Sequence, residues 1–154
     1  MQFGRYAAAD RKRAGTGKPG TFHFLGFTHI CGRIWKSGRF TVKRKTMRKR
    51  MTAKWHDMAA QLRRRLHEPI VTVGTWRNQV LNGYYNYHAV PGNLRSLWVF
   101  RNQVAQHWWR VLRRRSQKAR QRWVDFAPLI PQFLPVPTVR HPYPLERFYA
   151  KHPR

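Results

Sequence analysis

Acidic residues are the scarcest feature of this sequence. The 154 residues include 5 Asp and Glu against 32 Lys and Arg, which gives a formal net charge of +27. No acid occurs from position 11 to 56 or from position 69 to 124. A protein surface normally mixes both signs of charge, and a large excess of one sign strains a compact chain through self-repulsion. The imbalance therefore predicts a polyanionic partner, and nucleic acid is the first candidate.

The few carboxylates are also too scattered to predict catalysis. A general acid–base pair or a two-metal site needs acidic side chains that come together, and no close pair is visible here. The five acids are Asp10, Asp57, Glu68, Asp125 and Glu146. We therefore expect a chain that binds its partner and is not an enzyme on its own.

Metal-binding residues are sparse as well. His23, His29 and Cys31 fall on the same face of one predicted strand. Of these, His29 and Cys31 could contact one metal ion, but two ligands do not make a zinc site. The chain offers no Ser/His/Asp arrangement. We expect no metal and no cofactor in this chain.

The sequence predicts no internal disulfide, no signal peptide and no membrane span. The single cysteine, Cys31, excludes an internal disulfide. The first residues lack the apolar core of a signal peptide, and no apolar run is long enough to cross a bilayer. We expect a cytoplasmic protein without a membrane partner. An anionic membrane surface stays open as an alternative polyanion, although the apolar residues look like helix cores and not like a lone amphipathic anchor.

The N-terminal part predicts a connector followed by a β-hairpin. Residues 1–20 are rich in charge, Gly and Pro, which is typical of a basic connector. Thr21–Cys31 has large apolar residues on both faces and predicts one strand, with a bulge or a close backbone approach at Gly26. Arg39–Lys43 predicts the returning strand, so the hairpin spans 21–43.

A helix with two different faces is predicted over Lys43–Leu66. Its apolar residues recur every three or four positions, and Thr46 is a candidate N-cap. The apolar positions are Met47, Met51, Trp55, Met58, Leu62 and Leu66. Positive charges fall away from that face, at Lys45, Lys49, Arg50, Arg63 and Arg64. One side can bury against protein while the other presents fixed positive charge.

Further helices complete a predicted three- to four-helix bundle over 44–127. One runs from near Thr75 to just before Val90, and the next begins after a candidate N-cap at Asn93. Arg101 lies in the middle of the apolar face of this third helix, where it is either paired or snorkelling. A short fourth helix is predicted from about 118 to 126. The fold class is thus mainly α, with an N-terminal hairpin.

Prolines mark the C-terminal region as different. Seven of the ten prolines lie between positions 128 and 153, which blocks regular helix and sheet ladders. We expect residues 128–154 to form an extended tail. Four apolar residues are expected to pack it over the helices: Phe133, Leu134, Tyr143 and Phe148.

Candidate nucleic-acid-binding residues are arginines and lysines that lie off the apolar faces. Arginine suits phosphate because its guanidinium can donate two parallel hydrogen bonds. The candidates are Lys45, Lys49, Arg50, Arg63, Arg64, Arg110, Arg113 and Arg114. Trp109, at the edge of an apolar arc, is the candidate either for stacking on a base or for packing against another element. No zinc-finger, RNP1 or bZIP pattern is present, so we expect backbone and shape recognition.

Several motifs resemble one known family. Thr21-Phe-His-Phe-Leu-Gly-Phe-Thr-His29 and Arg39-Phe-Thr-Val-Lys-Arg-Lys-Thr46 resemble the end of the palm in group II intron-encoded reverse transcriptases. The maturase part of these proteins, also called the thumb or X domain, is similar to Tyr84-Tyr-Asn-Tyr-His-Ala-Val-Pro-Gly-Asn93, Leu112-Arg-Arg-Arg-Ser-Gln117 and His141-Pro-Tyr-Pro144. The motifs follow the family's order and span nearly the whole chain.

The resemblance implies two binding roles. Leu25, Gly26 and Phe27 would correspond to the primer grip, which seats the end of the growing strand. The helices would form the thumb, which clasps the template–primer duplex and binds group II intron RNA. Full-length relatives copy RNA into DNA with Mg²⁺ and assist the splicing of their own intron, so the resemblance places this chain in a bacterial ribonucleoprotein.

The sequence departs from the family in what it lacks. The catalytic aromatic-Ala-Asp-Asp box is absent, as are the fingers and most of the palm, and His23 stands where an acid is expected. We expect a C-terminal fragment, a split gene product or a truncated remnant. Three alternatives to a free-standing maturase domain stay open: the non-catalytic half of a reverse transcriptase whose palm and fingers lie on another chain, a general nucleic-acid-binding protein, and a non-functional remnant.

Overall fold

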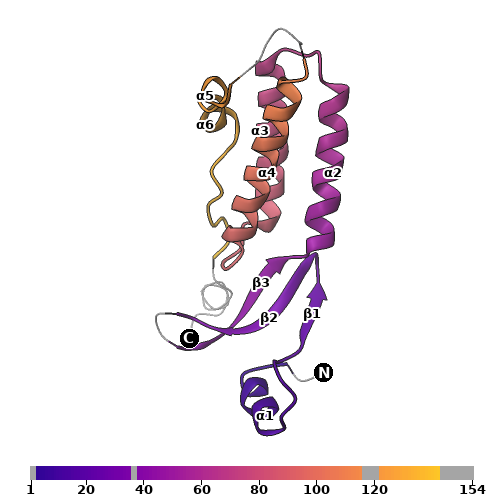
Figure 1. Ribbon diagram of the computed structural model, residues 1–154. Coiled ribbons are helices and arrows are strands. Elements are labelled where there is room, and N and C mark those ends of the chain that lie inside the picture. Colours follow the sequence, from indigo (N-terminus) through magenta and orange to yellow (C-terminus); the bar gives the residue numbers. More distant parts are fainter. Residues whose placement is uncertain (1–2, 36–37, 116–121, 143–154) are drawn as a thin grey trace.

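A small antiparallel sheet is followed by a bundle of long helices (Figure 1). The computed structural model describes residues 3–35, 38–115 and 122–142. Its elements are α1 (Ala7–Arg13), β1 (Thr21–Phe24), β2 (Phe27–Arg33), β3 (Phe40–Thr46), α2 (Arg48–Arg64), α3 (Ile70–His88), α4 (Leu94–Leu112), α5 (Trp123–Phe126) and α6 (Leu129–Phe133). The expected order of a hairpin and then a helix bundle is confirmed. The first helix, α1, lies within the stretch predicted to be only a connector.

The sheet has three strands in the order β1-β2-β3, one more than predicted. The expected single strand over Thr21–Cys31 is wrong, because the chain reverses at Leu25 and Gly26, between the paired residues Phe24 and Phe27. Both turn residues have positive φ, 46° for Leu25 and 77° for Gly26. Two successive positive values suit a two-residue hairpin turn that follows the right-handed twist of the strands. Gly26 therefore makes a tight turn and not a bulge.

The extra turn changes which histidines share a face. Phe22 now pairs with His29, and His23 pairs with Thr28. Residues that pair directly point to the same face and neighbours along a strand point to opposite faces. His23 and His29 are therefore on opposite faces of the sheet, and the predicted common face with Cys31 is wrong for His23.

Helix α2 begins five residues later than predicted. Strand β3 continues to Thr46, where it pairs with Phe27, so Lys45 lies on a strand and not on the helix. Met47, and not Thr46, occupies the N-cap position, without a side-chain hydrogen bond. The basic run Lys43–Lys45 suits an exposed edge strand as well as a helix, and the pairing with β2 decides between them.

Helix α3 starts at Ile70, five residues before the predicted start near Thr75. Its first turns contain β-branched residues and Gly74, which have low helix propensity and conceal the helix in the sequence. Pro69 occupies the N-cap position of this helix. Helix α4 follows Asn93 directly, as predicted.

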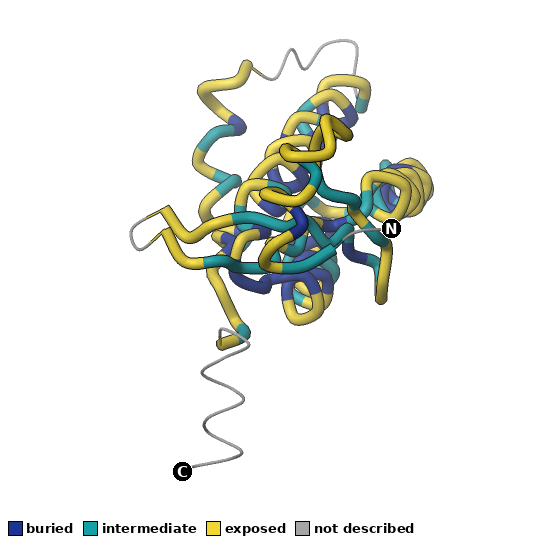
Figure 2. Tube along the Cα trace, turned by 90° about the horizontal axis from the view of Figure 1, so that it is seen from below, coloured by how far each residue is buried: buried dark blue, intermediate teal, exposed yellow. Residues whose placement is uncertain are grey.

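Aromatic and aliphatic side chains of α2, α3 and α4 form the core. Met58, Leu62 and Trp108 belong to this cluster. Buried residues gather in the middle of the bundle, and exposed residues make up most of its outer surface (Figure 2). The apolar faces predicted for the helices therefore point inward, and the bundle can hold surface charges at fixed positions.

Two buried arginines cross this core and bind backbone oxygens. Arg101 donates to the carbonyl oxygens of Leu134 (2.9 Å) and Pro135 (3.1 Å), so it is paired and does not snorkel. Arg77, which the sequence did not single out, donates to the carbonyl of Val104 at 3.0 Å. Its guanidinium lies 4.7 Å from the centre of the Trp108 ring, and burial lowers the pKa of Arg77 to about 9. Both arginines fix α4 in the bundle.

The proline-rich region contains a short helix and is not wholly extended. Helix α6 packs on α3, where a Cβ added to Gly74 would come within 2.5 Å of the Phe133 ring. Phe133 and Leu134 are buried, which confirms their predicted packing. Tyr143 and Phe148 lie outside the described residues, as do positions 118–121 of the predicted fourth helix, and α5 lies in its described part.

A buried asparagine joins the sheet to the bundle. The side chain of Asn93 accepts a hydrogen bond from the Thr46 backbone N–H (2.9 Å) and donates to Thr46 Oγ1 (2.7 Å) and to the carbonyl of His88 (2.8 Å). These groups come from the end of β3, the end of α3 and the start of α4. Asn93 is fully buried. Its side chain therefore links three elements, although it does not cap its own helix.

Replacing Asn93 with Ala should destabilise the protein strongly. The change leaves the buried N–H of Thr46 without its acceptor and removes one hydrogen bond each from Thr46 Oγ1 and the His88 carbonyl, so we expect the free energy of unfolding to fall by about 3 kcal/mol. Asn102→Ala, at an exposed position of α4, should change it by less than about 0.5 kcal/mol. Urea unfolding followed by circular dichroism measures both. Similar small effects in the two variants would contradict the linking role of Asn93.

Candidate nucleic-acid interface

The eight predicted cationic residues are all exposed, and they form two groups at opposite ends of α2. The lower group lies near the sheet and consists of Lys45, Lys49 and Arg50. The upper group lies at the far ends of α2 and α4 and consists of Arg63, Arg64, Arg110, Arg113 and Arg114. An α-helix rises 1.5 Å per residue, so Lys49 and Arg63 are about 21 Å apart along the axis.

Three arginines of the upper group lie near enough to His107 for their charges to act on it. Helices α2 and α4 both rise away from the sheet and pack side by side, so their C-terminal ends come together (Figure 1). Burial is the main cause that lowers the pKa of His107, and nearby positive charges lower it further. Those charges belong to the buried Arg77 and to Arg63, Arg110 and Arg114. The structure therefore brings together side chains that are about 50 positions apart in the sequence.

A polar groove continues from this group between α2 and α4. It has a volume of about 410 Å³ and is lined by Arg48, Met51, Thr52, Trp55, His56, Gln103, Gln106 and Arg110. The amides and the hydroxyl can donate to phosphate or sugar oxygens and accept from ribose hydroxyls. Neutral polar residues leave no charge pattern, so Thr52, His56 and the two glutamines could not be identified from the sequence.

The acids of the described residues do not neutralise this surface. The ion pairs in those ranges are Lys54–Asp57 (3.2 Å), Arg65–Glu68 (2.9 Å) and Arg122–Asp125 (3.4 Å). Each joins residues three positions apart, and none involves a member of the two groups. Within the described part of the chain, the positive charges of both groups therefore repel one another without an ion-pair partner.

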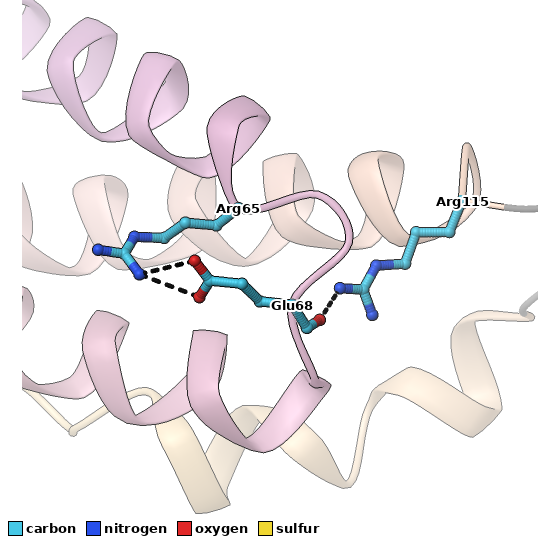
Figure 3. Close-up of polar contacts among 3 residues, drawn as sticks. All are labelled: Arg65, Glu68 and Arg115. Atoms are coloured by element: carbon cyan, nitrogen blue, oxygen red, sulfur yellow. Dashed lines mark hydrogen bonds and ion pairs between the residues drawn. The ribbon is translucent and has the colours of Figure 1, made fainter.

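Two further basic residues at the upper end have a structural role. Arg65 contacts both carboxylate oxygens of Glu68, at 3.0 and 2.9 Å, in the connection between α2 and α3 (Figure 3). Arg115, just after α4, donates to the carbonyl oxygens of Leu66 and Glu68. These contacts tie the end of α4 to the end of α2. They hold the arginines of the upper group at a fixed spacing.

Trp109 and Arg113 are directed toward α5 and not toward the groove. The Trp109 ring meets the Trp123 ring edge-on, with 5.2 Å between ring centres, and the Arg113 guanidinium lies 5.0 Å from the Trp109 ring centre. Trp109 is partly buried beside the core cluster. Of its two predicted roles, packing against another element is confirmed, and base stacking stays a prediction.

The residues that resemble a primer grip form an anchored turn. Tyr87 donates from its hydroxyl to the carbonyl of Leu25 (2.7 Å), and the Met47 N–H donates to the carbonyl of Gly26 (2.9 Å). Phe27 is buried and stacks on Tyr87, with 5.7 Å between ring centres. The Leu25 side chain stays 65% exposed. The turn is therefore rigid at its base and accessible at its tip.

The turn and the lower group meet at a small hollow. Its volume is about 340 Å³, and it is lined by Leu25, Gly26, Arg50, Tyr87 and His88. The sequence placed Leu25 and Arg50 in separate motifs, and the structure places them side by side. The exposed end of the turn thus lies next to a guanidinium that can bind phosphate.

His88 should make the protein acid-sensitive. Burial lowers the pKa of His88 to about 4, below its ordinary value of 6.5. The unfolded chain therefore binds a proton more readily, and the free energy of unfolding should fall as the pH drops from 6.5 toward 4, by at most about 1.4 kcal/mol per pH unit from this residue. Urea midpoints measured across this range should fall more steeply for the unaltered protein than for His88→Gln. Parallel curves would contradict the assignment.

Neither a metal centre nor a membrane span appears in residues 3–35, 38–115 and 122–142. No three His, Cys, Asp or Glu side chains in these ranges come together in a way that could hold a metal ion. None of the helices there is both long enough and apolar enough to cross a bilayer. Comparisons with protein-family models, curated proteins and solved structures found no match to this chain.

Proposed function

We propose that this chain is an RNA-binding maturase domain, similar to the thumb of group II intron-encoded reverse transcriptases, and that it binds group II intron RNA. The observation that carries the proposal is the set of exposed cations along α2 and α4, none of which has an ion-pair partner in the described part of the chain. An anionic polymer neutralises such a set, and the counterions that it releases drive binding. The family motifs in the sequence indicate which polymer.

The proposed mechanism is rigid electrostatic recognition. Arg63, Arg110 and Arg114 contact phosphates at one end, Lys49 and Arg50 contact them about 20 Å away, and the polar groove lies between the two helices. A folded RNA that fits this spacing is stabilised relative to RNA conformers that do not fit. This chain forms and breaks no bond in that process. It would assist splicing by favouring the active RNA shape.

A second partner follows from the turn at Leu25 and Gly26. Its exposed tip beside Arg50 supports contact with the end of a nucleic-acid strand. With a separate chain that supplies the palm, the fingers and Mg²⁺, this turn and the cationic surface of α2 and α4 would together clasp a template–primer duplex. In that arrangement this chain contributes binding only, and the polymerase chemistry belongs to the other chain.

Reversing the three charges around His107 should weaken RNA binding and flatten its salt dependence. Contact with 6–10 phosphates lowers affinity by roughly 10³–10⁵ between 50 and 200 mM salt. In Arg63→Glu/Arg110→Glu/Arg114→Glu, three contacts are lost, so the slope of log affinity against log salt should become less negative by roughly 2–3. Filter-binding titrations with a group II intron RNA measure both quantities.

The matched control changes the same charge elsewhere. Arg13→Glu/Arg33→Glu/Arg39→Glu alters three exposed arginines of α1 and the β2–β3 hairpin, none of which lines the α2–α4 groove. We expect a smaller loss of affinity in this control and unchanged melting temperatures in both variants. Equal losses would mean that net charge alone drives binding, as in a general nucleic-acid-binding protein. A flat salt response of the unaltered protein would exclude the electrostatic mechanism.

A further inference from the structure

A second hollow lies on one face of the sheet, on the other side of the hairpin turn. It has a volume of about 460 Å³. Rings make up much of its wall, and the residues that matter here are Phe24, Phe27, His29, Arg44, Tyr87 and His141. The Phe24 side chain is 58% exposed, so its ring is available to a ligand. A hollow of this size is large enough for a small planar molecule.

The hollow contains a positive charge that has no counter-charge among the described residues that line it. Arg44 lies on β3 directly opposite His29 and is partly buried, and its Nε is inaccessible to solvent and has no hydrogen-bond partner within residues 3–35, 38–115 and 122–142. Burial lowers the pKa of Arg44, and burial together with the Arg44 charge lowers the pKa of His29. No residue that lines the hollow is acidic. A partly buried guanidinium in this state favours an anionic ligand.

Interactions around the hollow fix its walls before any ligand arrives. His29 stacks on Phe22 with 4.7 Å between ring centres and 3° between the ring planes. The Tyr87 hydroxyl is bound to the Leu25 carbonyl, and His141 Nε2 lies 2.7 Å from the carbonyl oxygen of Asn86. Preformed walls reduce the ordering cost of binding.

We propose that this hollow holds one unpaired nucleotide of a bound RNA, with its base against the Phe24 and Tyr87 rings and its phosphate on Arg44. The inference rests on the proposed RNA-binding function and adds a separate site to it. A base within a duplex has both faces covered by its neighbours, so only a bulged, looped or terminal base can enter. Aromatic side chains hold such bases by stacking, largely regardless of sequence.

The position of the hollow favours an RNA strand over an acidic peptide. It shares Leu25 and Tyr87 with the smaller hollow that contains Arg50, so the two adjoin across the turn. A strand held by Arg50 on one side of the turn can reach Arg44 on the other side. A nucleotide supplies both the flat ring and the negative charge that the hollow accepts.

Three RNA hairpins test the proposal. One is fully paired, one carries a single-nucleotide bulge, and one carries an abasic bulge that keeps the phosphate without the base. Stacking of one base contributes about 1–3 kcal/mol, so the unaltered protein should bind the bulged hairpin roughly tenfold more tightly than the other two. Fluorescence anisotropy at physiological salt measures the three affinities.

Two variants should remove that preference. Arg44→Gln and Phe24→Ala should each bring the bulged hairpin close to the affinity of the paired one, with the melting temperature preserved. Lys43→Gln is the control, because Lys43 is the neighbour of Arg44 on β3 and points to the opposite face. It removes the same charge and should keep the tenfold preference.

The possible failures are distinguishable. Binding of paired and bulged hairpins with equal affinity would overturn the nucleotide site and leave the proposed function standing. A preference that survives in Arg44→Gln and Phe24→Ala would also overturn it. Displacement by an acidic aromatic dipeptide, together with no bulge preference, would assign the hollow to a protein partner instead. No binding of any RNA would overturn the proposed function itself.

Discussion

The shortage of carboxylates decides how each positive charge in this protein is stabilised. Inside the bundle, arginines bind backbone carbonyl oxygens: Arg77 binds that of Val104, and Arg101 binds those of Leu134 and Pro135. A carbonyl dipole satisfies the donors of a guanidinium without neutralising its charge. The acids that pair within the described residues do so with near neighbours in sequence. The exposed cations of the lower and upper groups therefore have no ion-pair partner among these residues, which supports the proposed polyanionic partner.

Rigidity at both ends of α2 turns these charges into a defined surface. At the lower end, Asn93 links the sheet to α3 and α4 through Thr46 and His88. At the upper end, Arg115 links α4 to the connection between α2 and α3. Side chains on a loose helix would adapt to any polyanion, whereas fixed spacings favour some RNA shapes over others. This combination is why we infer recognition of a folded RNA and not general coating.

Part of the fold could be predicted from the sequence, because the helical periodicity of apolar residues identifies the faces that point inward. The core positions of α2 and α4, the start of α4 after Asn93 and the burial of Phe133 and Leu134 all follow from local pattern. The turn at Leu25 and Gly26 could not be read, because aromatic residues on both faces hide the alternation that would separate two strands. Lys45 was placed on a helix because a basic run carries no period. Strand pairing, which is non-local, decides both cases.

Likewise, only part of the candidate site could be predicted from the sequence. Exposure of seven of the eight cations followed from their positions opposite the apolar stripes, Lys45 on β3 being the exception, but their grouping did not, because it depends on how α2 and α4 pack. Arg113 looked equivalent to Arg114 in the sequence, yet its guanidinium lies over Trp109. The neutral groove residues and the partly buried Arg44 could not be identified from the sequence, because their proposed roles depend on the residues that surround them in the folded structure.

Chemical protection of arginines tests the central claim most directly. Phenylglyoxal modifies accessible arginine side chains, and mass spectrometry of the protein with and without intron RNA reports the protection of each one. Binding along α2 and α4 predicts that Arg63, Arg110 and Arg114 become protected while Arg33 and Arg39 on the hairpin stay reactive. Equal protection of all five, or protection of the hairpin pair alone, would contradict it.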